Sequence, residues 1–169
     1  MKLLIGILIS ISLSYASSML PPKAPEVKKN YVMDFTKEDR CVVRNFNVYK
    51  DPKWVGKIEL KNGKKLFFSS PKSLIEFYHR PGKWHDIGVR SEDDFKDIIV
   101  TDYLTMKPIN AKTAYFIYGS RATSRAGDDL VSIENKSDAD YFYKKYSGKR
   151  MFKFNEVPDA LIRLLNGRI

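Results

Sequence analysis

Apolar and polar residues alternate in short stretches along most of the chain, a pattern typical of β-strands. The alternation predicts strands over residues 54–61 and 65–68, and Asn62-Gly63 between them is a strong signal for a tight hairpin turn. Apolar stretches farther along the chain predict four more strands, over residues 97–103, 109–118, 130–133 and 151–154.

Two segments have the apolar spacing and end signals of helices. Ser70-Pro71 places a capping hydroxyl before a proline at the first helical position, so a helix is expected over residues 71–79. A second helix is expected over residues 135–146, with acids in its first turn and lysines in its last, as the helix dipole prefers. A short terminal helix is expected to begin at Pro158.

Both halves of the chain therefore show the same order of elements: strand, strand, helix, strand. An internal duplication would produce two similar ββαβ units that bury their helix faces against each other or against a shared sheet. Chance similarity is the alternative, because short α+β segments resemble one another. We predict an α+β fold with one unit over residues 31–104 and a second over residues 105–169, the latter including the C-terminal helix.

The first 16 residues have the pattern of a cleavable export signal. Lys2 precedes an unbroken apolar run over residues 3–9, and Ser14-Tyr15-Ala16 is a small-x-Ala cleavage site. The run is shorter than the roughly 20 apolar residues that a membrane-spanning helix needs. Three prolines in residues 17–30 indicate an extended tether. We expect a periplasmic protein without a lipid anchor, because no cysteine lies near the cleavage site.

Removal of the signal leaves 29 lysines and arginines against 20 aspartates and glutamates. These cations are scattered over turns rather than gathered in one stripe, and an exported protein rarely meets nucleic acid, so nucleic-acid binding is not expected. The charge favours solubility and attraction to an anionic membrane surface or an acidic partner. The single cysteine, Cys41, excludes an intrachain disulfide, so the core must be hydrophobic.

Several motifs resemble the family of nitrous oxide reductase accessory proteins called NosL. The resemblance covers about residues 39–157 and is strongest in residues 100–120, with further matches at Glu38-Asp39-Arg40-Cys41, 51–55, 62–64 and 137–148. It implies a pair of ββαβ units related to organomercurial lyase. It also implies an activity: binding one Cu(I) ion outside the cytoplasm and passing it to the assembling copper centre of nitrous oxide reductase.

The copper ligands depart from the family pattern. The family's Cys-x-x-Cys-Gly-Met appears here as residues 41–46, in which Cys41 is retained but Arg44, Asn45 and Phe46 replace the second thiol, the glycine and the methionine. The family's Gly-Pro-Met-Gly loop appears as residues 124–127, with Ala126 in place of the methionine. Cu(I) is a soft ion that needs two or three converging thiolate or thioether donors. Candidate ligands are therefore Cys41 with replacements drawn from Met106, His85 and Met33.

Each of these candidates also has a structural interpretation. Cys41 could be a small buried hydrophobe, a thiol for a mixed disulfide, or a ligand shared with a partner protein, and Arg44 could lower the pKa of its thiol. Residues 121–125 replace the family's metal loop with two arginines, Arg121 and Arg125, that flank small residues. The two guanidiniums could bind a partner's carboxylates or phosphate groups, or the loop could be an ordinary polar turn.

Two functions remain open: Cu(I) binding and delivery through Cys41, and a metal-free adaptor that docks to nitrous oxide reductase or its maturation machinery. No enzyme activity is expected, because the cysteine pair of the lyase is absent.

Overall fold

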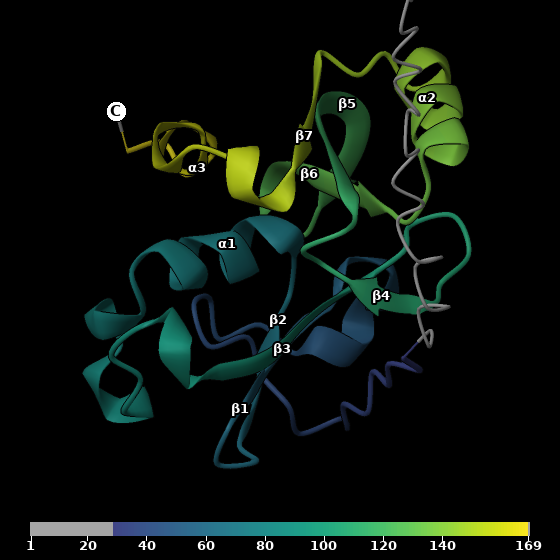
Figure 1. The fold of residues 1–169 in the computed structure, drawn as a ribbon. Helices are drawn as coiled ribbons and strands as arrows, with labels where there is room; N and C mark the ends of the chain where they lie inside the picture. The colour runs from purple at the N-terminus through teal and green to yellow at the C-terminus, as the bar shows by residue number, and fades with distance from the viewer. Residues whose placement is uncertain (1–28, 169) are drawn as a thin grey trace, which may run out of the picture.

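Two antiparallel sheets form the framework of the chain (Figure 1), in a computed structural model that describes residues 29–168. The predicted signal over residues 1–16, and all but the last two residues of the predicted tether over residues 17–30, lie outside the described residues. The first sheet has the order β2-β1-β3-β4, formed by β1 (Gly56–Leu60), β2 (Lys65–Phe68), β3 (Phe95–Thr101) and β4 (Pro108–Asn110). The second has the order β6-β5-β7, formed by β5 (Tyr115–Ser124), β6 (Gly127–Ile133) and β7 (Arg150–Lys153).

Three α-helices accompany the sheets, and their ends lie close to the predicted ones. Ser70 caps the first helix by accepting a hydrogen bond from the Ser73 N–H, and Asn135 caps the second by accepting one from the Asp138 N–H. The helices are α1 (Pro71–His79), α2 (Lys136–Lys145) and α3 (Asp159–Leu165). Short 3-10 helices lie in the connections: η1 (Val48–Lys50), η2 (Pro52–Trp54), η3 (Pro81–Lys83), η4 (His85–Ile87), η5 (Glu92–Asp94) and η6 (Phe154–Glu156).

The single strand predicted over residues 109–118 is wrong. A turn over residues 111–114 divides it into β4, which pairs with β3, and β5, which starts the second sheet. The apolar pattern hides this turn because Ala111 and Ala114 are both buried within it. β5 then continues to Ser124, past the end predicted at Gly119, because this glycine adopts a φ of +72° at an irregularity within the strand rather than ending it.

The two sheets share one topology. In each, the first strand is central, its hairpin partner lies on one side, and the strand after the helix pairs antiparallel on the other side. This arrangement agrees with the α+β fold expected from the repeated order of elements. The division between residues 104 and 105 stays a prediction, and β4 lies beyond it while extending the first sheet.

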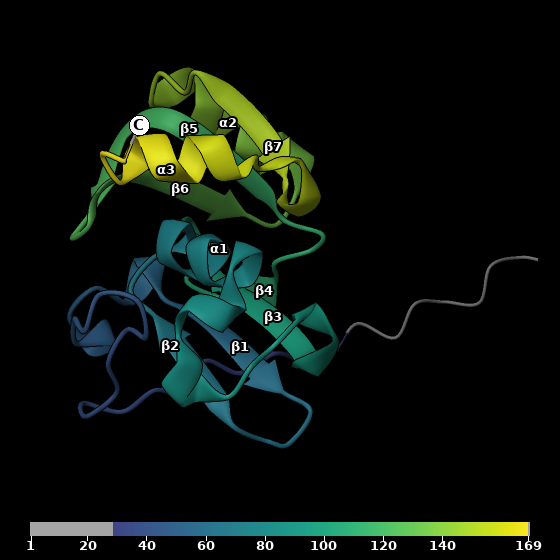
Figure 2. The same ribbon diagram turned by 90° about the vertical axis from the view of Figure 1, so that its left-hand side faces the viewer.

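Helix α1 lies between the two sheets (Figure 2), where it packs on β1 and β2 on one side and on β6 and α3 on the other. Helix α2 covers the opposite face of the second sheet, above Ile117, Val131 and Ile133. Because α1 is enclosed from two sides, even its polar residues Lys72, Ser73 and Glu76 are buried. The polar side of α1 therefore forms the junction between the two halves of the molecule.

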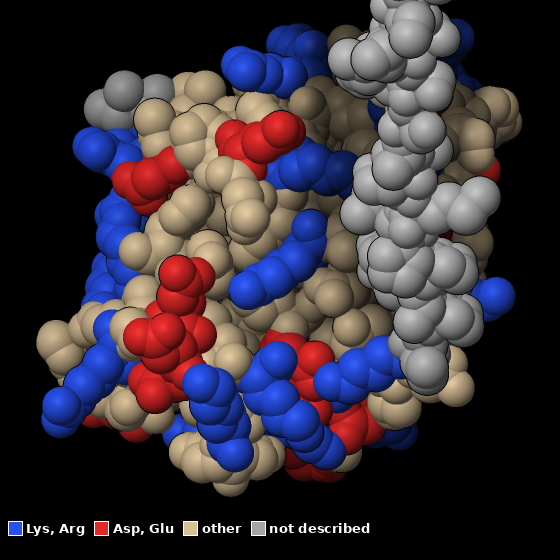
Figure 3. All heavy atoms as spheres, in the orientation of Figure 1, with Lys and Arg blue, Asp and Glu red and all other residues tan. Residues whose placement is uncertain are grey.

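On the face shown in Figure 3, lysine and arginine side chains are interspersed with acidic ones rather than gathered in a stripe. None of the helices within residues 29–168 has the length and apolar character needed to cross a membrane.

Candidate functional site

A tight turn carries the one cysteine that the chain shares with the family motif. The Cys41 carbonyl accepts a hydrogen bond from the Asn45 N–H at 2.8 Å, and the Cys41 N–H donates to the Phe46 carbonyl at 2.8 Å. Asn45 closes the turn with a φ of +57°, in the left-handed region that glycine and asparagine tolerate best. Asn45, at the position that the motif gives to glycine, therefore allows the same tight turn. The second thiol and the thioether of the motif are absent from it.

Cys41 is buried, with 2% of its surface exposed, and is not part of a disulfide. The neighbouring Val42 N–H donates to the carbonyl of Phe67 at 3.0 Å, which fastens the turn beside β2, the outermost strand of the first sheet. Cys41 belongs to the apolar core that also contains Val48 and Leu66. In this position the thiol packs as a small hydrophobic side chain.

Arg44, at the position of the family's second thiol, points its guanidinium at α1. Its Nε donates to the Ser73 Oγ at 3.0 Å, and its Nη2 hydrogen-bonds Asn166 Oδ1 and lies 3.7 Å from Glu76 Oε2. The Arg44 guanidinium, which the sequence suggested as a neighbour of the Cys41 thiol, is instead part of a polar network between α1 and the chain after α3.

Glu76 is the centre of that network. Its carboxylate, 3% exposed, accepts a hydrogen bond from the Asn166 amide at 2.9 Å, is ion-paired with Arg168, and lies 3.5 Å from the ammonium of Lys83. With Arg44, three cations surround a single buried carboxylate. A buried carboxylate that lost these partners would be an uncompensated charge and would destabilise the folded state.

Phe46, at the position of the family's methionine, lies under Arg125 of the β5–β6 hairpin. The guanidinium carbon is 5.7 Å from the centroid of the Phe46 ring, within the range of a cation–π interaction. The two segments that would carry the family's copper donors therefore do meet in space. Here they meet through an aromatic ring and a cation instead of through sulfur atoms.

The backbone around Ala126, at the position of the other methionine, holds a buried cation. The ammonium of Lys72, on a side chain 1% exposed, donates to the carbonyls of Ala126, Asp128 and Leu165 at 2.8, 2.7 and 3.1 Å. Burial lowers the pKa of Lys72, and burial also raises the pKa of the neighbouring Asp129. Asp129 accepts hydrogen bonds from the Lys72 N–H at 2.8 Å and from the Ser124 hydroxyl at 2.8 Å.

The replacement ligands predicted from sequence are spread over the first half of the molecule. Met106 is 41% exposed in the loop after β3, at the β4 side of the sheet, whereas Cys41 lies beside β2. Three strand spacings separate these edges, which is about 14 Å. His85 is exposed at the start of η4, and Met33 alone packs against the same apolar core as Cys41.

Within residues 29–168, no three His, Cys, Asp or Glu side chains are grouped closely enough to hold a metal ion. Because Met106 lies at the opposite edge of the first sheet from Cys41, the structure does not gather Cys41, Met106 and His85 at one point. The buried network of Lys72, Glu76 and Asp129 was missed from the sequence, because these residues lie on the polar side of predicted elements and nothing in the pattern marks that side as buried.

The two predicted partner-binding arginines lie in different surroundings. Arg125 is at the hairpin turn over Phe46, whereas Arg121 donates its backbone N–H to the Tyr146 carbonyl at 3.0 Å and its Nη2 to the Ser147 hydroxyl at 3.2 Å. Arg121 thus belongs to the C-terminal end of α2, and the two do not form one binding group.

Comparison with known proteins identifies the family of this chain. The model of the NosL family matches residues 16–162, nearly the whole chain. Among solved structures, the chain is similar to the copper chaperone NosL from Shewanella denitrificans, with 25% sequence identity, a TM-score of 0.65, and coverage of 78% of this chain and 98% of that one. No curated protein matches the sequence.

The chain therefore belongs to the NosL family, as its motifs indicated. The family and the similar chaperone agree with the expectation that it is not an enzyme.

Proposed function

We propose that this chain is an exported NosL-family accessory protein that serves nitrous oxide reductase maturation as an adaptor, without carrying copper itself. One observation carries the proposal: Arg44, Phe46 and Ala126 stand where the family has soft donors, and each is integrated into a contact that binds the two halves of the molecule together. The export signal over residues 1–16 supports a periplasmic location.

The donors present do not fit Cu(I). A chaperone must hold its cargo with two or three soft ligands, and only Cys41 remains of the family's set. The ammonium of Lys72 and the guanidiniums of Arg44 and Arg125 also surround the junction, and like charges in a partly buried region oppose the entry of another cation. Arg44, which stands in place of one ligand, therefore also acts against a metal ion.

A second candidate function is Cu(I) binding through Cys41 with a replacement ligand. The observation in its favour is that Met33 packs against the core that contains Cys41, so a thioether and a thiol share one apolar region. Met106 and His85 would need a rearrangement of the sheet edges to join them. This function requires the turn over residues 41–46 to open, since Cys41 is 2% exposed.

Complementation separates the two functions. A strain that lacks this protein would receive either the parent chain or the Cys41→Ser variant, and the copper content and activity of nitrous oxide reductase would be measured. The adaptor function predicts equal restoration by both, whereas copper delivery through Cys41 predicts restoration by the parent alone. Met106→Leu, at a candidate ligand on the opposite edge of the sheet from Cys41, should restore activity under the adaptor function.

A titration of the purified exported protein against a Cu(I) chelator gives an independent result. The adaptor function predicts that neither the parent nor Cys41→Ser competes with the chelator. One tightly bound equivalent that is lost with Cys41→Ser, and also weakened by Met33→Leu, would overturn the adaptor function in favour of the second candidate.

A further inference from the structure

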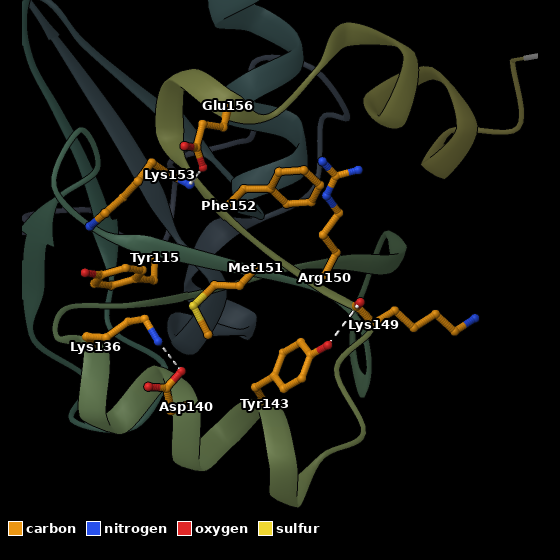
Figure 4. Close-up of a pocket in the computed structure, with 10 residues that line it drawn as sticks. All are labelled: Tyr115, Lys136, Asp140, Tyr143, Lys149, Arg150, Met151, Phe152, Lys153 and Glu156. Carbon is orange, nitrogen blue, oxygen red and sulfur yellow. Dashed lines mark hydrogen bonds and ion pairs between the residues drawn. The ribbon is translucent and has the colours of Figure 1, made fainter.

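A depression of about 550 Å³ lies between α2 and β7, away from the junction of the two halves (Figure 4). It is lined by residues of β5, α2, β7 and the segments that flank β7: Tyr115, Lys136, Asp140, Tyr143, Lys149, Arg150, Met151, Phe152, Lys153 and Glu156. None of Cys41, Arg44, Phe46 and Ala126 lines this depression.

The floor is apolar and the rim is basic. Met151 projects from the face of the second sheet toward α2, and Tyr143 closes the floor from the helix. Tyr115 also lies in the floor, but the ammonium of Lys153 covers its ring, 3.2 Å from the centroid. Four cations line the rim against two carboxylates, Asp140 and Glu156.

Both carboxylates are already engaged inside the protein. Asp140 is ion-paired with Lys136, and Glu156 accepts a hydrogen bond from the Lys153 N–H at 2.8 Å. By contrast, no carboxylate of residues 29–168 forms an ion pair with Lys149 or Arg150. Arg150 lies over the ring of Phe152 at 4.7 Å, which leaves its N–H groups available. The depression therefore offers positive charge that the protein does not neutralise itself.

One side of the depression is an open strand edge. β7 pairs with β5 and is the outermost strand of the second sheet among the described residues. The N–H of Lys153 points away from β5, to the carboxylate of Glu156. Because N–H and C=O groups alternate in direction along a strand, Met151, two residues earlier, presents its own backbone groups to the same edge. An extended chain can add to such an edge by backbone hydrogen bonds.

We propose that this groove binds an extended acidic segment of a partner protein. The segment adds to the free edge of β7 beside Met151, places an apolar side chain against Met151 and Tyr143, and pairs its carboxylates with Lys149 and Arg150. Charge complementarity favours this occupant, since the unneutralised groups are cations and the whole chain carries a net charge of +10. The inference rests on the adaptor function and gives the chemistry of its partner.

Peptide binding tests the inference directly. The probe is a fluorescent eight-residue peptide in which aspartate and glutamate alternate with valine and leucine, and its anisotropy is followed as the purified protein is added in copper-free buffer. The expected result is saturable binding that Lys149→Glu with Arg150→Glu weakens by roughly tenfold or more. A peptide of the same pattern with lysines in place of the acids should not bind.

Three controls keep the test decisive. Lys61→Glu with Lys64→Glu makes the same charge change at exposed sites in the β1–β2 hairpin of the other sheet and should leave binding within about twofold, as expected from long-range charge alone in salt. An acidic peptide with alternate N-methylated amides should bind more weakly, because it cannot pair with the strand edge. Circular dichroism, together with the milder pair Lys149→Gln and Arg150→Gln, distinguishes lost contacts from unfolding.

The proposal would be overturned if the charge reversal at Lys149 and Arg150 and the control charge reversal weakened peptide binding equally. It would also be overturned if N-methylation of the peptide had no effect on binding. Binding to vesicles of phosphatidylglycerol and phosphatidylcholine that depends on Lys149 and Arg150, without binding of the acidic peptide, would also overturn it and identify an anionic membrane surface as the occupant. Because copper is absent throughout, these outcomes are independent of the complementation result for Cys41.

Discussion

The guanidinium of Arg125 lies over the ring of Phe46, with 5.7 Å between the guanidinium carbon and the ring centroid. This contact joins the β5–β6 hairpin to the turn that follows Cys41, two segments that are far apart in the sequence. The resemblance to the family motif implies a methionine donor in each segment. In this chain an aromatic ring and a guanidinium close the junction between the two segments instead.

A double-mutant cycle measures how strongly Phe46 and Arg125 interact. Phe46→Leu and Arg125→Gln are expected to show a coupling free energy of about 0.5–1 kcal/mol in urea unfolding, the usual value for a cation–π pair near the surface. Phe46→Leu combined with Arg121→Gln is the matched control and should show no coupling, because Arg121 contacts the end of α2 instead. Additive effects of the Phe46 and Arg125 substitutions would show that the pair contributes nothing to the junction.

Loss of the Glu76 carboxylate should destabilise the chain more than loss of any one of its cations. Glu76→Gln leaves Arg44, Lys83 and Arg168 without their shared counter-charge, and we expect a decrease of about 2–3 kcal/mol in the free energy of unfolding. Arg168→Ala should cost less, because its side chain is 46% exposed and solvent screens the pair. Equal effects of Glu76→Gln and Arg168→Ala on urea unfolding would contradict this ranking.

Local signals in the sequence predicted the secondary structure because each element carries its own start or stop residue. Ser70-Pro71, Asn62-Gly63 and Asn135 act through hydrogen bonds and backbone angles within a few residues, and the helices and the first hairpin form where they indicate. The turn at Ala111 and Ala114 was missed because small apolar residues stay buried through it, so the hydrophobic pattern continues without a break.

The candidate site could be predicted only in part, because it depends on what covers α1. The family motif identified residues 41–46 and 124–127, and the structure brings these two segments together through Phe46 and Arg125. Lys72 and Glu76 looked like the solvent-facing side of an amphipathic helix. They are buried because β6, α3 and the chain after α3 pack on that side, a tertiary arrangement that no local pattern encodes.

Acid should weaken the attachment of residues 32–34 to the first sheet. Burial alone would raise the pKa of Asp34, but hydrogen bonds from Lys57, at 2.7 Å, and from Lys65 lower it to about 2. A lowered pKa stabilises the folded state above the unfolded value of 3.8, and this stabilisation is lost as the pH falls from about 4 to about 2. We expect a contribution of about 1 kcal/mol, because solvent screens a carboxylate that is one-third exposed.

Urea unfolding of the parent and of Asp34→Asn at pH values between 2 and 6 checks this window. The parent should lose stability relative to the variant as the pH falls from 4 to 2, and the difference should be constant above pH 5. Asp140→Asn, which removes the exposed pair with Lys136 on α2, is the control for a carboxylate outside this contact. A difference between the parent and Asp34→Asn that does not depend on pH would contradict the assignment.

If the adaptor function is correct, restoring the donors expected of the family should create a Cu(I) site that the parent does not have. The variant carries Arg44→Cys, Asn45→Gly, Phe46→Met and Ala126→Met, which with Cys41 provides two thiols and two thioethers. The turn over residues 41–46 must open to expose Cys41, but the substitutions fit the local backbone. Asn45 already has a φ of +57°, which glycine adopts freely, and Lys72 holds the carbonyl of residue 126 whatever its side chain. Removal of the Arg44 guanidinium also removes a positive charge from the junction, while Glu76 keeps Lys83 and Arg168 as partners.

We expect the restored variant to bind one Cu(I) equivalent and to compete with a chelator at least about a hundredfold better than the parent, since soft ions gain affinity with each converging sulfur donor. The same variant with Cys41→Ser should lose most of this affinity. The three substitutions in residues 44–46 without Ala126→Met should give an intermediate value, because one thioether is missing. If the restored variant is folded by circular dichroism yet binds no better than the parent, the two segments do not converge on one metal position, and the view that Phe46 and Arg125 replace a copper site is wrong.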